Sequence, residues 1–442
     1  MAGFTALLRN LKGIQMVVHP LLEEKAQGAE GVSADEPNTS KRPVARSEAS
    51  EGYGAQRDIP RKLDIYAASA GYELRNELDF LSKRTIEPNI FYNARFLAPA
   101  MPRLEDRTIR FMVMRDKNEE RSRLRFVMPY TMERLGWGSG QTMLRAWTTR
   151  FSPQGTPLID QDDPSGVVDD LFDILSRKHL QLPQAMVFPH MRSNGATTKT
   201  IREVARQRQL PMQVLENAPR PFLISDLTGE DYFQKHTSGG QAMQMQALLE
   251  SLSELGDVQY TVSTGIDDIR LKFERFILLE NRTERTKHKT KIVGDRYREA
   301  FAREAVNNLA ERGAVQLHSL ELNDKTIAAA ILFIENGDAW LWKSACSESL
   351  RSFMPDSLLL QEVVKHVLAN PAIKRLDACT LTEHPLLNTI FNVQKPQETL
   401  IIGLHKDAHR LVDKATAKVR FRNQSSALKR MLRQVARTIK LV

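Results

Sequence analysis

The sequence has little cysteine and no long apolar run, and these two absences argue against several classes of protein. Its 442 residues include two cysteines, Cys346 and Cys379, whose positions do not match a zinc site or a disulfide scaffold. So few cysteines fit a reducing compartment, and we expect a cytoplasmic protein. No run of about 18 or more apolar residues occurs, so we expect no transmembrane helix. The first residues show no apolar core followed by a cleavage site, so we expect no secretion signal.

Common catalytic signatures are also missing. The sequence contains no Walker loop, no GxGxxG after a strand, no HExxH and no GxSxG. Candidate functional residues must therefore come from their positions at the ends of predicted strands and helices.

The positive charge of the chain lies at its C-terminal end. Residues 404–442 contain eleven Lys or Arg and two Asp, which gives this segment the same net charge, +9, as the whole chain. The remaining residues are close to neutral, so an argument for an anionic partner has to start from this segment.

Residues 405–442 are predicted to form a basic amphipathic helix, because apolar residues recur there at helical spacing with basic residues between them. Three interpretations remain open. The apolar stripe packs on the body of the protein, or the helix lies on an anionic membrane surface as a peripheral contact at the inner membrane. Nucleic acid is the least favoured partner, since aromatic residues are few. The apolar positions are Leu428, Met431, Leu432, Val435, Ile439 and Val442.

The rest of the chain divides into four predicted parts. Residues 1–25 have helical apolar spacing and are expected to pack on the body or to bind a membrane or partner. Residues 26–61 have the composition of a disordered linker. Residues 62–217 and 218–404 are each predicted to be a mixed α/β domain, and the similar order of their elements indicates a diverged internal duplication.

Residues 313–391 show the clearest pattern. They predict three consecutive strands, a loop, a helix and another strand, and the middle strand is apolar enough to be buried on both faces. Helices are predicted before this stretch and one strand after it. The predicted strands are 315–322, 326–334, 339–345, 373–379 and 396–405, and the helices are 241–255, 266–285, 295–312 and 357–369. In the first domain we expect helices at 66–81, 94–98, 167–177 and 197–209, and strands at 108–114, 123–129, 143–147, 185–188 and 212–215.

The start of the predicted helix at Ser357 is a candidate anion site. Free amides of Asp356, Ser357 and Leu358 would suit a pyrophosphate, because a helix N-terminus carries unpaired N–H groups and positive partial charge. The alternative is an ordinary turn in which Asp356 or Ser357 caps the helix.

Two other residues stand out by position. His384 follows a strand end, where it would serve as an acid or base near neutral pH or merely cap a helix. Lys343 lies on an apolar strand, and its side chain either reaches solvent or points into a cleft towards an anion. Cys379 fits a small buried residue better than a nucleophile.

Several segments resemble the GNAT-superfamily acyltransferases of the bacterial CelD (cellulose biosynthesis-associated) type and the tandem-GNAT Fem-type transferases. Residues 313–320 and 326–329 look like the two central strands, and Phe353–Leu359 stands where the family has its pyrophosphate loop. The other matching segments are Trp342–Ala345, Asp377–Ala378, His384–Pro385, Phe391, Pro157–Leu158 and the helix near Leu171. The resemblance extends over residues 62–404 and implies two GNAT-like domains in tandem.

This resemblance implies an acyltransferase that uses acetyl-CoA or another acyl-CoA as co-substrate, with a saccharide or envelope precursor as acceptor. In the family pattern His384 would be the acid–base residue, Asp377 would orient the site, and Lys343 would meet a phosphate or acidic acceptor. Donor-binding groups would be Trp342, Ser344, Asp356, Ser357 and Leu358, and acceptor-binding groups Glu280, Arg285 and Lys287. The rival hypothesis is a non-catalytic GNAT-like scaffold that binds a partner in polysaccharide synthesis.

Departures from the family pattern fall on the donor side. Asp356 replaces a glycine and places a carboxylate where a diphosphate would approach, which disfavours anion binding. Cys346 and Ser347 replace a Tyr-Asp pair. The segment 280–292 keeps Glu280, Arg285 and Lys287 but lacks the family's Trp and glycines.

Overall fold

The computed structural model describes residues 47–52, 60–105, 108–117, 122–136, 140–282, 291–381 and 384–439, with the side chains of 51–52 and 426–439 excepted. The predicted N-terminal helix at 1–25 lies outside these residues, as do Arg285 and Lys287. Within the described ranges, no helix combines the length and the apolar character needed to cross a membrane.

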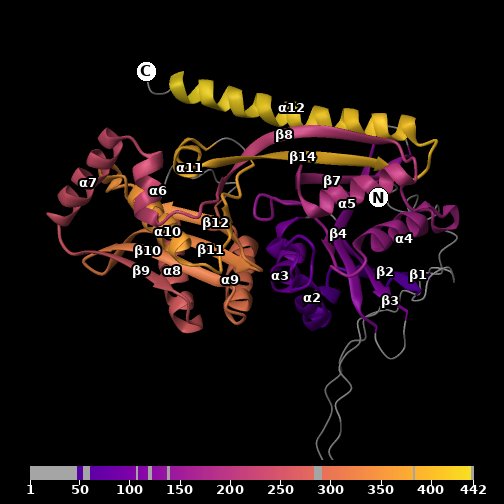
Figure 1. Ribbon diagram of the computed structural model, residues 1–442, viewed down its shortest axis with the longest axis horizontal. Coiled ribbons are helices and arrows are strands. Elements are labelled where there is room, and N and C mark those ends of the chain that lie inside the picture. Colours follow the sequence, from indigo (N-terminus) through magenta and orange to yellow (C-terminus); the bar gives the residue numbers. More distant parts are fainter. Residues whose placement is uncertain are drawn as a thin grey trace, which may run out of the picture.

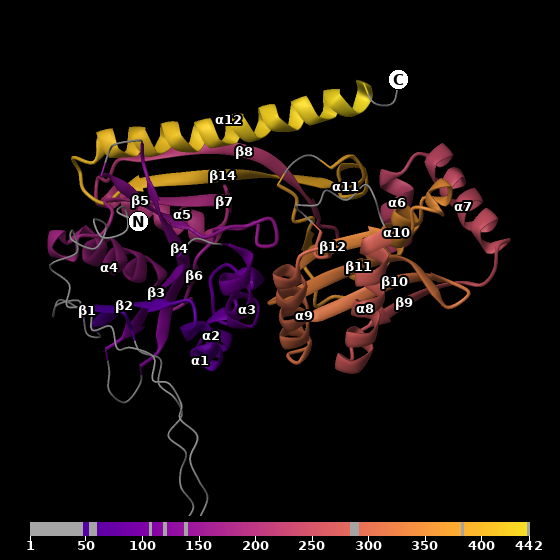
Figure 2. The ribbon, with the colours of Figure 1, turned by 180° about the vertical axis from the view of Figure 1, so that it is seen from behind.

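Two lobes share one mixed, mostly antiparallel sheet (Figures 1 and 2). The described strands form a 14-stranded sheet in the order β1-β2-β3-β4-β5-β7-β14-β8-β13-β12-β11-β10-β9, with β6 beside β4. Helices cover both faces of the sheet, which confirms the predicted α/β class with two similar halves.

The N-terminal lobe contains the elements up to β8. A short strand, β1, lies inside the stretch predicted to be a linker, and Arg61–Ala67 is a strand although a helix was predicted to begin at Tyr66. The elements are β1 Ala49–Gly52, β2 Arg61–Ala67, α1 Ala70–Glu73, α2 Arg75–Ser82, α3 Ala94–Leu104, β3 Arg110–Asp116, β4 Leu124–Arg134, β5 Thr142–Ala146, β6 Leu158–Ile159, α4 Pro164–Ser176, β7 Ala185–Arg192, α5 Ala196–Gln207 and β8 Met212–Leu223.

The C-terminal lobe begins with two helices and repeats the order of the first lobe. The predicted helices and strands of residues 313–391 are present, and β9 is a strand in a region predicted to be mostly helical. The elements are α6 Gly229–His236, α7 Gly239–Ser253, β9 Val258–Ser263, α8 Ile266–Arg282, α9 Arg296–Ala310, β10 Val315–Leu322, β11 Lys325–Glu335, β12 Asp338–Cys346, α10 Pro355–Ala369, β13 Arg375–Asp377, α11 Pro385–Ile390, β14 Val393–Gly403 and α12 His409–Ile439.

The internal repeat is visible in the topology. In each lobe four strands pair antiparallel in sequence, and a helix then leads to a strand that lies parallel to the fourth. Both of these helices, α4 and α10, start with a proline that follows a residue in the left-handed region: Asp163 has φ 52° and Met354 has φ 48°. The shared backbone device supports the duplication that the order of elements predicted.

The two lobes exchange their last strands. β8, which ends the first lobe, pairs with β13 of the second lobe, and β14, which ends the second lobe, pairs with β7 of the first. β8 and β14 also pair with each other along most of their length (Figure 1). The predicted domain boundary at 217/218 therefore falls inside β8, and backbone hydrogen bonds connect the lobes continuously.

Burial follows the strand pattern on β11. Ala329, Ile331 and Phe333 face a core shared with α8, α9 and the N-terminal lobe, while Ala330 and Leu332 face a second core under α10. The prediction that this strand is buried on both faces is confirmed. Burial of each large aliphatic side chain contributes about 1.5–3 kcal/mol.

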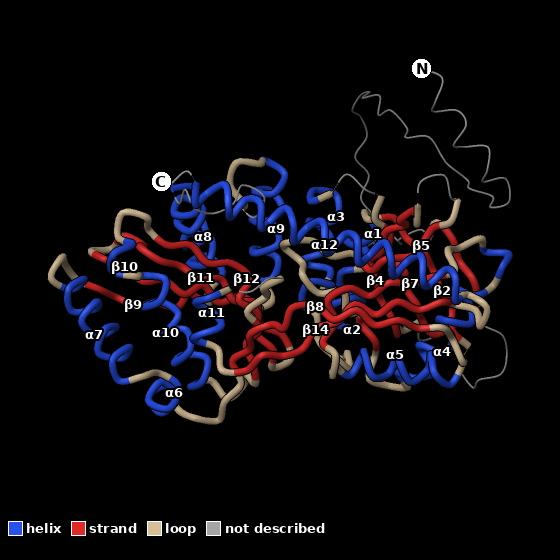
Figure 3. The backbone as a smooth tube through the Cα atoms, turned by 90° about the horizontal axis from the view of Figure 1, so that it is seen from above, coloured by secondary structure: helices blue, strands red, loops and turns tan. Residues whose placement is uncertain are grey.

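α12 runs along β8 and β14 and extends over the side of the C-terminal lobe (Figures 1 and 3). Its first half packs on the sheet through Val412, Ala415 and Val419, which join a small core with Val187 and Ile401. The interpretation in which the helix packs on the body thus holds for its first half.

Candidate active site

β12 and β13 diverge after a short parallel contact. Their pairing runs over three residues and ends at Trp340 with Asp377. Two residues later Cys379 has φ 54°, a left-handed conformation that turns the chain away from β12. Beyond Trp340, no strand among the described residues pairs with the edge of β12 that faces β13.

A bulge on β12 shapes this opening. Ile331 of β11 pairs with Lys343, whereas the next residue, Leu332, pairs with Leu341, so Trp342 is the extra residue. A bulge bends its strand and redirects the side chains around it. Trp342 and Lys343 are thereby turned towards the interface between the lobes.

Aromatic rings and Lys343 meet at that interface. The Trp342 indole N–H donates to the carbonyl oxygen of Phe151, which comes from the N-terminal lobe, at 3.0 Å. The Lys343 ammonium lies 4.4 Å from the centre of the Phe151 ring. Burial is the main reason that the pKa of Lys343 falls to about 8, with Arg298 and Arg150 lowering it further and Glu280 opposing the shift. Lys343 is therefore an amine that exchanges a proton near neutral pH.

Glu280 is a buried carboxylate next to this amine. It lies in the last turn of α8, and its Oε2 accepts hydrogen bonds from the amides of Ile292 (2.8 Å) and Val293 (3.2 Å). These bonds anchor the chain as it returns to α9, so Glu280 has a structural duty beside its electrostatic contact with Lys343. Ser344, one of the predicted donor-binding residues, is exposed.

The start of α10 is not a row of free amides. Pro355 has no N–H, and the amides of Ser357 and Leu358 donate to the carbonyl oxygen of Met354 at 3.0 and 3.1 Å. The Asp356 carboxylate also accepts from the amide of Ser357 at 3.0 Å. These residues do not fit the diphosphate of an acyl-CoA, because the carboxylate already takes the place of the anion and repels another one.

His384 and Asp356 come together beside this helix start. His384 caps α11, and its Nδ1 accepts from the amide of Leu387 at 3.4 Å. Desolvation lowers the pKa of His384, and the negative charge of Asp356 opposes this shift. The pKa of Cys346 is raised to about 11, first by burial and then by the negative charge of Asp356. Asp356 thus faces both an imidazole and a thiol.

Asp377 is the centre of a buried junction between the lobes. Its Oδ2 accepts from Gln154 Nε2 (2.8 Å) and Arg220 Nη1 (3.1 Å), and its Oδ1 accepts from the amide of Cys379 (2.7 Å). The guanidinium of Arg220 also donates to the carbonyl oxygens of Thr380 and Pro153. Burial and Asp377 raise the pKa of the Cys379 thiol, which argues against a nucleophile there.

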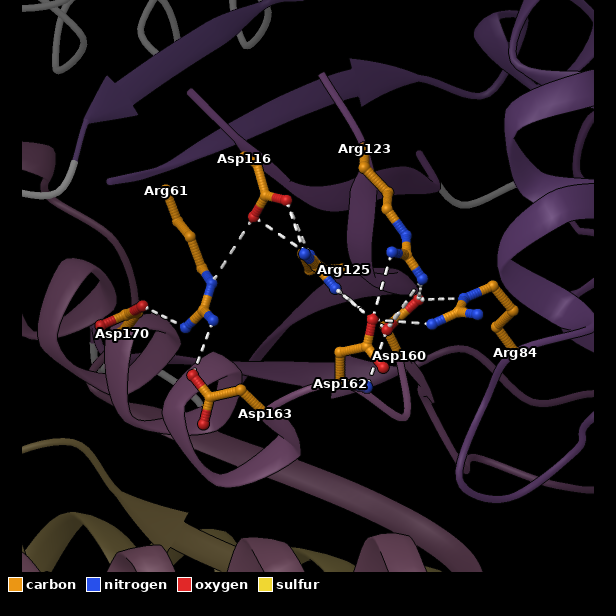
Figure 4. A network of polar contacts seen from close by, with 9 residues as sticks. All are labelled: Arg61, Arg84, Asp116, Arg123, Arg125, Asp160, Asp162, Asp163 and Asp170. Atoms are coloured by element: carbon orange, nitrogen blue, oxygen red, sulfur yellow. Dashed lines mark hydrogen bonds and ion pairs between the residues drawn. The ribbon is translucent and has the colours of Figure 1, made fainter. Parts of the chain in front are cut away.

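The equivalent helix start in the N-terminal lobe is occupied by charged side chains (Figure 4). Arg84, Arg123 and Arg125 converge on the carboxylates of Asp160 and Asp162. Arg61 links Asp116, Asp163 and Asp170 on the other side of the cluster. This network fills the region from which α4 begins, so the C-terminal lobe is the better candidate for chemistry.

Three residues at the site were not predicted from the sequence. Phe151 and Gln154 come from the segment between β5 and β6, and Arg220 comes from β8, so all three reach the diverging strands from the N-terminal lobe. Each has an unremarkable sequence context, and only knowledge of the strand exchange would have pointed to them.

Comparisons with known proteins match most of the C-terminal lobe to a domain family. Residues 243–384 match the acetyltransferase (GNAT) domain family. Among solved structures, FemX is 8% identical, with a TM-score of 0.50 over 76% of this chain and 98% of that one. A conserved protein of unknown function from Bacteroides thetaiotaomicron VPI-5482 is 13% identical, with a TM-score of 0.48 over 75% and 96%.

A tandem GNAT protein from the clavulanic acid biosynthesis pathway is 10% identical, with a TM-score of 0.38 over 77% of this chain and 98% of that one. No curated protein sequence matches the chain. The match to FemX shows a shared fold. Residues 243–384 thus resemble the acetyltransferase (GNAT) domain family, within a fold of two similar lobes.

Proposed function

We propose that the chain is an acyltransferase whose reaction takes place where β12 leaves β13, with Lys343 as the base. The observation that carries the proposal is the place of Lys343. Its amine lies next to the bulge of β12, in the segment that matches the acetyltransferase family, where β12 and β13 diverge. The acceptor is an amine or hydroxyl compound, and a saccharide or envelope precursor follows from the sequence resemblance alone.

The chemical role of Lys343 is proton removal. In its neutral form the amine takes the proton from the acceptor's N–H or O–H group as that atom attacks the acyl carbon. The C–S bond of the thioester then breaks, and the departing thiolate takes the proton back from the Lys343 ammonium. Strand amides near Trp342 and Ser344 donate to the acyl oxygen as negative charge develops on it. His384 is the alternative base, and Asp377 supports the geometry through its bonds across the lobes.

The rival proposal is a GNAT-like scaffold without catalysis, and the specific observation in its favour is Asp356. Isothermal titration with acetyl-CoA separates the two readings. We expect weak binding to the wild type and about ten-fold tighter binding to Asp356→Gly, because the substitution removes about 1.4 kcal/mol of charge repulsion.

Asp356→Asn is the matched control, since it removes the charge but keeps an oxygen near the amide. It should fall between the wild type and the glycine variant. If none of the three proteins binds acetyl-CoA at millimolar concentration, an acyl-CoA-dependent enzyme is ruled out and the scaffold reading stands.

We also propose that the outer face of α12 makes a peripheral contact with anionic membranes. Phe421 on this helix is 72% exposed and is flanked by the exposed Arg420 and Arg422. An apolar ring beside basic groups suits the boundary of an anionic bilayer.

Sedimentation with phosphatidylglycerol vesicles tests this contact. Phe421→Ser should lower the partition coefficient about ten-fold, because roughly 1.5 kcal/mol of apolar burial is lost. Leu271→Ser, which changes a 55% exposed apolar residue on α8, should leave it unchanged. Equal partition of both variants and the wild type would reject the membrane role.

A further inference from the structure

A cavity of about 240 Å³ opens where the exchanged strands meet. It is lined by residues from β7, β8, β13 and β14 and by the loop after α2, so both lobes contribute to it. Its wall includes Arg192 and Arg375, which both form ion pairs with Asp338. Asp338 is the first residue of β12, five residues before Lys343. At about 3.3 Å per residue Asp338 lies roughly 16 Å along β12 from the proposed base. None of the residues assigned to the acyl-transfer site lines the cavity, so it is a separate site.

Cations outnumber anions around this cavity. The charged residues that line it are Glu87, Arg192, Arg375 and Lys395, which give the wall a net charge of +2. Asp338 lies behind the wall, and counting its carboxylate lowers the net charge of the whole cluster to +1. The surplus positive charge belongs to Lys395, whose side chain is exposed and has no ion-pair partner among the described residues.

The two arginines are held in place by carboxylates. Arg192 Nε lies 2.6 Å from Glu87 and its Nη1 lies 3.4 Å from Asp338, while Arg375 contacts both oxygens of Asp338 at 2.6 and 2.7 Å. The hydrogen bonds found in the described part of the chain leave Arg192 Nη2 and Arg375 Nη1, one nitrogen of each guanidinium, without a hydrogen-bond acceptor. A guanidinium has five N–H donors, so both arginines keep donors for a further oxyanion.

Glu87 is neutralised from two sides. It accepts from Arg192 and from the amide of Thr197 at 3.0 Å. Because these two donors offset the negative charge of Glu87, it repels an incoming anion less than a free carboxylate would. The remaining wall includes the apolar side chains of Ile86, Phe222 and Pro396, so the cavity is basic at one part and apolar at another.

We propose that this cavity binds a small organic oxyanion, a phosphate or carboxylate group on an apolar stem, with the oxyanion between Arg192, Arg375 and Lys395. The apolar stem contacts Phe222 and its neighbours. Because the lining charge is +2, a doubly charged phosphate ester binds more tightly than a carboxylate of the same shape. The site is independent of the proposed acyl transfer.

Isothermal titration of the full chain with phenyl phosphate, benzoate and inorganic phosphate tests the proposal. We expect phenyl phosphate to bind most tightly, benzoate more weakly because it carries one charge, and inorganic phosphate more weakly because it lacks the apolar stem. If benzoate binds more tightly than phenyl phosphate, the carboxylate is the natural group and the oxyanion site stands.

Lys395→Gln should raise the dissociation constant of phenyl phosphate about ten-fold, since an exposed lysine is replaced without loss of packing. Lys178→Gln removes an equally exposed charge in the N-terminal lobe and should change it less than two-fold. Asn194→Trp, at the rim, should block binding while leaving the melting temperature near that of the wild type.

Absence of heat with all three probes at millimolar concentration would overturn the proposal. Equal effects of the Lys395 and Lys178 substitutions would overturn it too, because binding would then follow net charge and not the cavity.

Discussion

Replacement of Lys343 by Met or by Arg should lower acyl transfer at least 100-fold, while the protein stays folded. General-base catalysis contributes about 10²–10⁴-fold, and neither replacement offers a neutral amine: Met has none and Arg stays protonated. Thiol release from acetyl-CoA with an amino sugar as acceptor measures the rate. Lys325→Met changes an exposed lysine at the start of β11 and is the matched control, expected to keep the wild-type rate.

The pH profile identifies which residue is the base. The pKa of Lys343 is lowered to about 8, so only roughly a tenth of the amine is neutral at pH 7 and the rate should rise with pH to a plateau above 8. The pKa of His384 is lowered from its ordinary value of 6.5, so a histidine base would give a rise with its midpoint below 6.5. A midpoint below 6.5, lost in His384→Ala, would show that the histidine is the base and that Lys343 is not.

Removal of the Asp377 carboxylate should destabilise the protein by about 3–5 kcal/mol, because it leaves the guanidinium of Arg220 buried without its partner. The side chains of Asp377 and Arg220 are 3% and 1% exposed. The free energy of unfolding of Asp377→Ala, measured in urea, gives the effect. Asp267→Ala removes an exposed partner of Arg270 and should cost less than about 0.5 kcal/mol.

Asp377→Asn separates a structural role from a catalytic one. If Asp377 acts by holding the lobes, the asparagine variant loses stability and its residual folded fraction keeps the wild-type midpoint in the pH profile. A shifted midpoint with unchanged stability would instead make Asp377 a positioning residue for the base. An Asp377→Ala variant as stable as the wild type would contradict the interlobe role.

Local pattern was enough to predict much of the C-terminal lobe. The strand at residues 315–322 and the apolar run of β11 each depend on neighbours in the chain, and both are found as predicted. The short strands β1 and β9 were missed, because their residues form a strand only through partners far away in the sequence.

The candidate active site shows the same division between local sequence signals and tertiary contacts. The sequence alone identified Lys343 as an unusual cation on an apolar strand and Asp356 as a carboxylate at a helix start, since both depend on one element. Only the tertiary structure placed Phe151 against Lys343, Arg220 against Asp377 and Arg192 beside Arg375. Those contacts depend on the exchange of β8 and β14 between lobes, and pairing between strands almost two hundred residues apart leaves no local signal in the chain.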